Sequence, residues 1–319
     1  MKRAMAFMVL AFIAAYAFAA DYPTKPIRIV SPFPPGGSVD LVARLVGADL
    51  SKALGQQVVI DNRSGASGMI GTEVAAKSAP DGYTLLVNTL PFVTNQFVYG
   101  KAPYDPIGDF APVSLLASVA SVLVSHPALP VNSMKDLIAL ARAKPGAITY
   151  GSAGAGTNPH IAGELLNNLA KIKLVAVHYK GGGPATIATL SGETQLYFVN
   201  AIPEALPYIE AKRLKALGIT AARRNPAAPQ IPTMAEAGVP GYEFVTWQIL
   251  AAPKGTPATI IATLNEKVRA VLKTPEAIKR WQERGFDVIA STPEEMTAHL
   301  MSEIKKWRVV FKEQGIKAE

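Results

Sequence analysis

The chain has 319 residues, no cysteine and a formal net charge of +8. Without cysteine it can form neither disulfides nor a reactive thiolate. Its basic residues are scattered, and the longest clusters are only Arg223-Arg224 and Lys305-Lys306, so the concentrated patch expected of a nucleic-acid binder is missing. We therefore expect no nucleic-acid partner, and at most a mild attraction of anionic solutes.

The first twenty residues have the pattern of an export signal. Lys2 and Arg3 precede an apolar run over 4–20 that is too short to span a bilayer comfortably and ends in small residues before Asp21. A retained N-terminal anchor is the alternative, but no flanking charge follows the run to stop transfer. Removal of 1–20 leaves 30 Lys and Arg against 24 acidic residues, a net charge of +6. We expect a soluble, monomeric protein long enough for two domains.

From Ile27 onward, short β-rich runs alternate with helix-length amphipathic segments, which is typical of an α/β protein with mainly parallel strands. Ser38 is expected to cap a helix that Gly55 ends. The apolar segment 111–125 is expected to leave a first sheet for a second. The other elements expected in this half are strands at 27–30, 58–60 and 85–88 and a helix at 69–77.

A second series of helices and strands begins near residue 135. Asn158 and Pro159 are expected to be the cap and first residue of one helix. A linker rich in proline and alanine, 223–241, ends the series. The expected helices are 135–143, the one after 158, 184–192 and 203–211, and the expected strands are 148–150, 174–179, 195–199 and 214–220.

The remaining C-terminal segment predicts one extended run, 244–252, and helices that begin at Pro257, Pro275 and Pro293. These helices need a sheet to pack on, and the first series has fewer helices of its own. We therefore assign them back to the first sheet. The expected organisation is a first lobe made of 21–120 and 240–319, and a second lobe made of 121–239.

Three glycine-rich turns each follow an expected strand and precede a helix. In an open α/β sheet, such turns line the crevice at the carboxyl ends of the strands, where ligands bind. A helix N-terminus there offers free N–H donors and a partial positive charge, so each turn is a candidate anion seat. A tight turn needed only for packing is the alternative in each case. The turns are PFPPGGSVD (32–40), YGSAGAGTNPH (150–160) and YKGGGP (179–184).

The glycine turns do not match the common nucleotide-binding or hydrolase motifs. A P-loop would need a lysine in register, and no Gly-x-Ser-x-Gly elbow is present. Gly154 and Gly156 begin a dinucleotide fingerprint, and Asp61 mimics its ribose-binding acid. Pro159, however, stands in place of the third glycine. We expect no cofactor.

The histidines and other reactive side chains do not form a catalytic or metal-binding pattern. His126, His160, His178 and His299 lack the spacing of zinc ligands, and His160 with Glu164 fits a helix-face pair better. At a helix N-terminus, His160 is expected to be neutral and able to donate to a ligand. An exported enzyme acting on a carboxylate would have to use His160, Asp40 or Ser152, and no third group orients them. We expect no enzyme activity and no metal.

Six motifs stand in this order along the chain: YPTKPIRIVSPFPPGGSVDLVARLVGADLSKALGQQVVIDNRSGASGMIG, PDGYTLLV, YGSAGAGTNPHIAGELL, VHYKGGGPATIATLSGETQLYF, LKALGIT and PTMAEAGVPGYE. Their order and spacing closely resemble the substrate-binding receptors of tripartite tricarboxylate transporters, the Bug family. The resemblance covers essentially the whole chain beyond 1–20. It implies a two-lobed, type II-like periplasmic binding protein that closes on a small carboxylate and delivers it to a membrane permease. Docking on a sensor protein is an alternative output.

The resemblance also implies which residues bind the ligand between the lobes. No arginine lies in these loops, so the donors must be backbone N–H groups and small hydroxyls. Asp40 is expected to order its helix N-terminus, since its charge would repel a carboxylate. The implied residues are Phe33, Pro34, Gly36, Gly37 and Asp40 in the first loop; Ser152, Ala153, Gly154, Gly156, Thr157 and His160 in the second; and Asn88, Tyr179, Lys180, Gly181, Asn200, Trp247 and Gln248 in the walls.

Two positions depart from the family pattern. Val199 is apolar where many relatives carry an acid, and Gln248 follows Trp247 where a small residue is usual. Together they favour an unsubstituted or aromatic dicarboxylate over an amino acid. The alternative for Val199 is a core strand residue that never meets the ligand.

Overall fold

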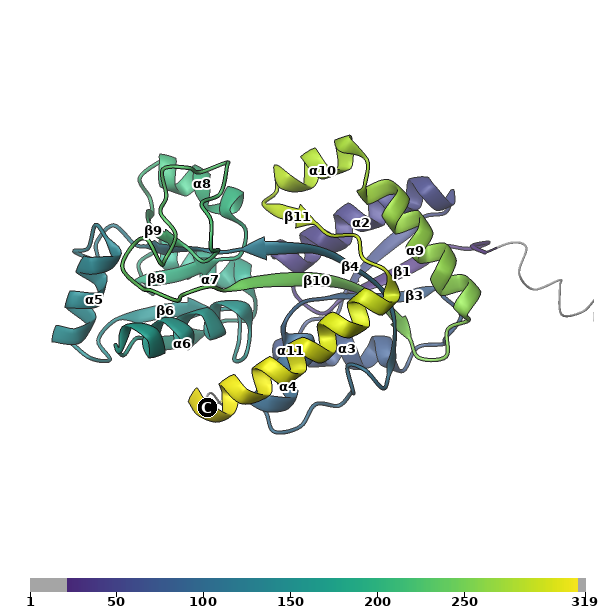
Figure 1. The fold of residues 1–319 in the computed structure, drawn as a ribbon, viewed down its shortest axis with the longest axis horizontal. Coiled ribbons are helices and arrows are strands. Elements are labelled where there is room, and N and C mark those ends of the chain that lie inside the picture. Colours follow the sequence, from purple (N-terminus) through teal and green to yellow (C-terminus); the bar gives the residue numbers. More distant parts are fainter. Residues whose placement is uncertain (1–21, 315–319) are drawn as a thin grey trace, which may run out of the picture.

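The computed structural model describes residues 22–314, so the expected export signal over 1–20 lies outside the described residues. Two β-sheets, each flanked by helices, lie end to end along the long axis of the molecule (Figure 1). The predicted α/β class is confirmed, but the sheets are mixed rather than mainly parallel. The strand orders are β11-β4-β10-β3-β1-β2 in the first sheet and β7-β6-β8-β5-β9 in the second.

The first sheet is parallel only at one side, because β10 runs antiparallel to both β3 and β4, and β11 runs antiparallel to β4. In the second sheet, β5 is likewise antiparallel to β8 and β9. The strands of the first sheet are β1 (Ile27–Ser31), β2 (Val58–Asn62), β3 (Thr84–Asn88), β4 (Phe110–Ala120), β10 (Val245–Pro253) and β11 (Phe286–Val288); those of the second are β5 (Val122–Ser125), β6 (Thr149–Ser152), β7 (Val175–His178), β8 (Leu196–Val199) and β9 (Lys215–Ile219).

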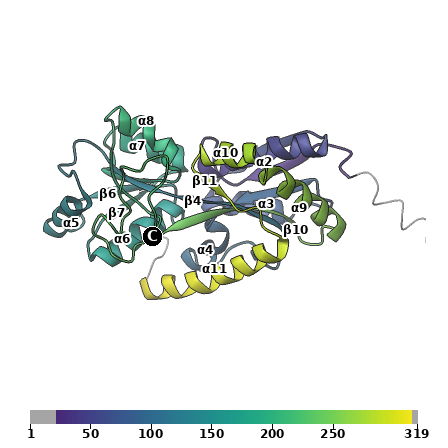
Figure 2. The same ribbon diagram turned by 45° about the horizontal axis from the view of Figure 1, so that its top comes forward.

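Helices cover both faces of the first sheet, and the three C-terminal helices return to it as expected (Figures 1 and 2). One face buries apolar residues of α2, α9 and α10, and the opposite face buries those of α3, α4 and α11. The helices are α2 (Ser38–Leu54), α3 (Met69–Ala76), preceded by the 3₁₀ turn η1 (Ala66–Gly68), α4 (Pro91–Val98), α9 (Ala258–Leu272), α10 (Pro275–Gln282) and α11 (Pro293–Gln314).

The second sheet is covered in the same way, by α5 and α6 on one face and by α7 and α8 on the other. These helices are α5 (Met134–Ala143), α6 (Asn158–Ala170), α7 (Gly182–Leu190) and α8 (Ile202–Glu210). Among the described residues, no helix is both long enough and apolar enough to cross a bilayer.

The chain passes between the sheets at two adjacent points. Ser121 alone separates β4 of the first sheet from β5 of the second, as the apolar segment 111–125 predicted. The return crossing leads into β10, whose Val245 pairs with Ala120. Thr220 ties the two crossings together, since its Oγ1 accepts from the Ser121 amide (2.8 Å) and its carbonyl accepts from the Phe244 amide (2.8 Å). This arrangement holds the glycine turns after β1 and β6 opposite each other.

Helix α2 has the buried face and the C-cap that the sequence predicted, but its N-cap is one residue earlier than predicted. Val42, Val46 and Leu50 are buried on one face, and Gly55 is the left-handed C-cap, as predicted. The N-cap, however, is the extended Gly37, and the Ser38 side chain makes no capping hydrogen bond. The same shift occurs at α6, whose N-cap is Thr157 rather than Asn158. In both helices the residue expected to be the cap instead lines the space between the sheets.

Candidate functional site

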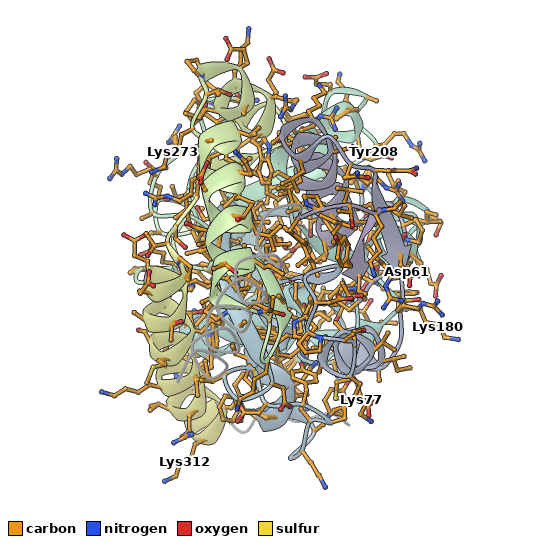
Figure 3. All side chains as sticks on the ribbon, turned by 90° about the vertical axis from the view of Figure 1, so that its right-hand side faces the viewer. Asp61, Lys77, Lys180, Tyr208, Lys273 and Lys312 are labelled. Atoms are coloured by element: carbon orange, nitrogen blue, oxygen red, sulfur yellow. The ribbon has the colours of Figure 1, made fainter. Side chains whose placement is uncertain are left out.

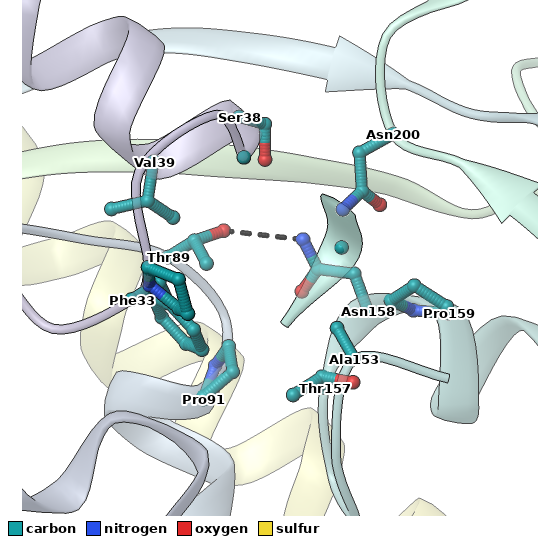
Figure 4. A pocket seen from close by; sticks show the side chains of 13 residues that line it. Phe33, Ser38, Val39, Thr89, Pro91, Ala153, Thr157, Asn158, Pro159 and Asn200 are labelled. Atoms are coloured by element: carbon teal, nitrogen blue, oxygen red, sulfur yellow. Dashed lines mark hydrogen bonds between the residues drawn. The ribbon is translucent and has the colours of Figure 1, made fainter. Parts of the chain in front are cut away.

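A pocket lies between the two sheets, where the turns after β1 and β6 face each other (Figure 4). The empty space between its sides is about 400 Å³, a volume that includes open solvent at its mouth. We call its two sides the first wall and the second wall. The first wall is Phe33, Pro34, Gly37, Ser38, Val39, Thr89 and Pro91, and the second wall is Ala153, Thr157, Asn158, Pro159, Gly182 and Asn200.

The loop of the first wall is held by the carboxylate of Asp40, which is only 3% exposed. Its Oδ2 accepts from the Gly36 amide (3.0 Å) and from Arg44 Nε (2.9 Å), and its Oδ1 accepts from Asn62 Nδ2 (2.9 Å). Burial alone would raise the pKa of Asp40, but these hydrogen bonds outweigh burial and hold the pKa below its ordinary value of 3.8. Asp40 is therefore ionised, and both of its carboxylate oxygens accept hydrogen bonds. Ser38 and Val39, in the first turn of α2, line the pocket.

The loop of the second wall is held without a charge. The hydroxyls of Ser152 and Thr157 both donate to the Gly154 carbonyl, at 2.8 and 2.6 Å. The Gly156 amide donates to His160 Nδ1 at 2.9 Å, so the ring proton of His160 is on Nε2. Burial, followed by the nearby ring of His178, lowers the pKa of His160 to about 4, so the ring is neutral at physiological pH. The two hydroxyl protons are used inside the loop rather than offered to a ligand.

The side-chain amide of Asn200 and the hydroxyl of Ser38 are hydrogen-bond donors that do face the pocket. Asn200 Oδ1 accepts from the Ser121 hydroxyl (3.4 Å), which turns its Nδ2 toward the pocket, and the Ser38 hydroxyl points the same way (Figure 4). The N-termini of α2, α6 and α7 reach the pocket through Ser38, Asn158 and Gly182. No lysine or arginine of the described chain lines it. The site is therefore positively polarised by dipoles, without a full positive charge.

The two walls touch each other around this pocket. Asn158 Nδ2 donates to Thr89 Oγ1 (3.4 Å), and the Thr94 hydroxyl donates to the Gly156 carbonyl (3.3 Å). At Gly181, whose φ is +115°, an added Cβ would lie 2.9 Å from Pro34 Cγ. Backbone of one side thus packs directly on side chains of the other, so the molecule is in a closed arrangement.

The profile of the "Tripartite tricarboxylate transporter family receptor" (TctC) matches residues 42–316. The chain belongs to this receptor family. It is 36% identical over 313 residues to protein BugT of Bordetella pertussis, covering 98% of this chain and 96% of BugT.

Solved structures agree in fold. R. palustris Rpa4515 with adipate has a TM-score of 0.90 and 39% identity, covering 93% of this chain and 99% of Rpa4515. MatC of Rhodopseudomonas palustris with bound malate has a TM-score of 0.85 and 32% identity, covering 91% and 99%. The family and these relatives are solute-binding receptors of a transport system and not enzymes, as the sequence predicted, and receptors of this family are periplasmic. No group of acidic or histidine side chains in the described part of this receptor could hold a metal ion.

The structure divides the residues that the sequence singled out into two groups. The first group lines the pocket: Phe33, Pro34, Gly37, Ala153, Thr157 and Asn200. The second group lies outside the lining: Gly36, Asp40, Asn88, Ser152, Gly154, Gly156, His160, Tyr179, Lys180, Gly181, Trp247 and Gln248. Most of the second group directly supports the first, as the loops held by Asp40 and His160 show.

Several residues outside the lining are tied to other partners. Trp247 Nε1 donates to Glu303 of α11 at 3.0 Å, and the Tyr179 hydroxyl donates to Glu193 at 2.9 Å. The Asn88 amide spans Thr72 and the backbone of Thr89, while Lys180 points into solvent, as do Lys77, Lys273 and Lys312 on other elements (Figure 3).

The two positions that depart from the family pattern are also away from the pocket. Val199 is 3% exposed in the core beside Val122, which it pairs with across β8 and β5. Gln248 is fully buried on β10. Since neither residue lines the pocket, the pocket gives no support to the preference for an unsubstituted or aromatic dicarboxylate that was based on them.

The sequence missed Ser38, Val39, Thr89, Pro91, Asn158, Pro159 and Gly182 as lining residues. Most of them sit inside or next to the glycine turns already identified, so extending each turn into the first helical turn would have included them. Thr89 and Pro91 lie at the start of α4, a helix that the sequence pattern did not reveal. Its N-cap is Leu90, which has no side chain able to cap, so Pro91 at the first helical position was the only start signal in the sequence.

Proposed function

We propose that this receptor captures a small mono- or dicarboxylate in the pocket and delivers it to the permease of a tripartite tricarboxylate transporter. In this proposal the first lobe is 21–120 with 240–319 and the second lobe is 121–239. The chain is exported to the periplasm by residues 1–20 and acts as a monomer.

The observation that carries the proposal is the convergence of three helix N-termini and the Asn200 amide on one pocket that has no lysine or arginine in its lining. Such a site favours an anion while remaining weak enough to release it. The solved relatives support the ligand class, since Rpa4515 is described with adipate and MatC with malate.

The expected strength of binding shows why closure belongs to the function. A helix N-terminus contributes about 0.3–1 kcal/mol to an anion, and up to about 2 kcal/mol when partly buried. Micromolar binding corresponds to about 8 kcal/mol, so the three N-termini supply only part of it. The remainder comes from hydrogen bonds and apolar contacts that are complete only when the walls meet. A carboxylate that bridges both walls therefore favours the closed arrangement.

Binding can be measured directly by titration calorimetry of the full mature chain against C4 to C9 mono- and dicarboxylates. Gly37→Val places two methyl groups at the mouth of the first wall and is expected to weaken binding at least tenfold. Gly183→Val is the matched control, because Gly183 is in α7 but does not line the pocket, and neither glycine has an atom closer than 3.9 Å to an added Cβ. Equal affinities for the two variants would contradict the placement of the anion at this wall.

A further inference from the structure

The amide of Asn158 has a fixed orientation in the pocket. It extends from the second wall toward the first, where Nδ2 donates to Thr89 Oγ1 (3.4 Å) and to Thr246 Oγ1 (3.2 Å). The Thr89 hydroxyl gives its own proton to the Trp247 carbonyl at 2.6 Å, so toward Asn158 it can act only as an acceptor. The nitrogen of the Asn158 amide must therefore face Thr89, and the oxygen must face elsewhere.

The oxygen of this amide lacks a donor. Asn158 is 2% exposed, and its Oδ1 accepts no hydrogen bond from any residue that the structure describes. Figure 4 shows Oδ1 turned away from Ser38 and Asn200, toward Pro91 and Thr157, and the atom is buried. Buried polar atoms are nearly always paired, so this unpaired acceptor beside a ligand pocket is available to a donor group on the ligand.

The surroundings restrict what that donor can be. An unsubstituted carboxylate has only acceptor oxygens at neutral pH and would repel Oδ1. An ammonium group could donate, but the pocket lining contains no aspartate or glutamate to balance its charge, and Asp40 is already bound to Arg44. The helix N-termini would also repel it. A hydroxyl group donates without carrying a charge and meets both conditions.

We propose that Asn158 is a specificity-determining residue that selects a carboxylate bearing a hydroxyl group, such as a 2-hydroxydicarboxylate, over its unsubstituted counterpart. The carboxylate lies against Asn200, Ser38 and the helix N-termini, and the hydroxyl donates to Asn158 Oδ1. The inference rests on the proposed function, because it names the ligand class for the same pocket.

The test compares pairs of acids that differ by one hydroxyl group, so that chain length is controlled. Calorimetric titrations of the full mature chain use malate with succinate, 2-hydroxyglutarate with glutarate, and 2-hydroxyadipate with adipate. For at least one pair, the hydroxy acid is expected to bind about tenfold or more tightly than its partner, because a site that pairs with a substrate hydroxyl discriminates strongly against its loss.

Variants connect this preference to the amide oxygen. Asn158→Leu keeps the approximate size of the side chain but removes the acceptor, so the ratio of the two affinities should fall to within about threefold of one, mainly through weaker binding of the hydroxy acid. Asn158→Ser, a residue well suited to a helix N-terminus, should do the same and serves if the leucine variant does not fold. Thr246→Val is the control, since it removes a partner of Nδ2 and leaves Oδ1 in place; it should retain the preference.

The outcomes separate the two proposals. If the wild-type receptor binds none of the acids, including those of the wider C4 to C9 screen, the proposed function is overturned and this inference with it. If it binds them without a preference for the hydroxyl group in any pair, or if Asn158→Leu and Asn158→Ser keep the wild-type ratio, the inference alone is overturned.

Discussion

The two glycine turns of the pocket are ordered by different side chains, the first by a charged one and the second by a neutral one. Each glycine turn follows a strand, precedes a helix and brings the N-terminus of that helix to the pocket. The first is held by Asp40, an ionised carboxylate with three hydrogen bonds, and the second by His160, a neutral ring that accepts from the Gly156 amide. The comparison shows that a turn can be ordered by charge or by a neutral acceptor, and that the choice sets how the turn responds to pH.

The largest effect is expected for Asp40→Ala. This change removes the partner of Gly36, Arg44 and Asn62 at once, and charge-assisted hydrogen bonds to a buried carboxylate are strong. We expect the free energy of unfolding to fall by about 3–4 kcal/mol. Chemical denaturation at pH 7 measures it. Asp61→Ala is the control, because Asp61 pairs with Arg63 and Arg28 at the edge of the sheet. A loss for Asp40→Ala no larger than for the control would show that the turn is ordered by other contacts.

His160 should lower the stability of the folded receptor in mild acid. Its pKa is about 4 in the folded receptor and about 6.5 in the unfolded chain, so only the unfolded chain gains a proton as the pH falls from 6.5 to 4. The contribution of the neutral ring is fully present above pH 6.5 and is lost across this window. Wild-type stability should therefore fall by about 3 kcal/mol more than that of His160→Gln.

The control for this pH profile is His126→Gln. His126 Nδ1 also accepts from a backbone amide, that of Ala128 at 3.2 Å, but His126 does not line the pocket. The slope of His160→Gln between pH 6.5 and 4 is compared with that of this variant. The carboxylate of Asp40 titrates lower, because its pKa lies below 3.8 and its contribution is lost only as the pH falls through that value. If the free energy of unfolding of His160→Gln falls with pH as steeply as that of the wild type, groups other than His160 cause the acid response.

Sequence patterns foresaw the features of the fold that depend on neighbouring residues. The buried face of α2, the left-handed end at Gly55 and the crossing near Ser121 all follow from periodicity, cap chemistry or apolar runs. Strand direction did not follow, because it depends on how distant segments pair. The three-residue β11 was too short to give a pattern.

The same limit applies to the site. The glycine turns were found because glycine and cap residues stand together in the sequence, and Phe33, Gly37 and Asn200 do line the pocket. The orientation of Trp247 could not be found in this way, since its indole partner Glu303 lies 56 residues away. The role of Thr89 likewise depends on its bond to the Trp247 carbonyl, 158 residues along the chain. Which side of a residue faces a pocket is decided by such long-range contacts.

The smallest effect on stability, and the sharpest test of contact between the two sides, is expected for Gly156→Ala. Gly156 has φ of +73°, and an added Cβ would lie 2.6 Å from Val98 Cγ2 on the opposite side. The left-handed backbone alone costs about 1–2 kcal/mol in the second loop, while the clash acts only when the sides meet. Ligand affinity should therefore fall further than the strain explains, by roughly tenfold. Val98→Ala removes the two methyl groups nearest to the clash, so the double variant Gly156→Ala, Val98→Ala should recover affinity but not stability. If affinity does not recover in the double variant, contact between these two sides does not limit closure on the ligand.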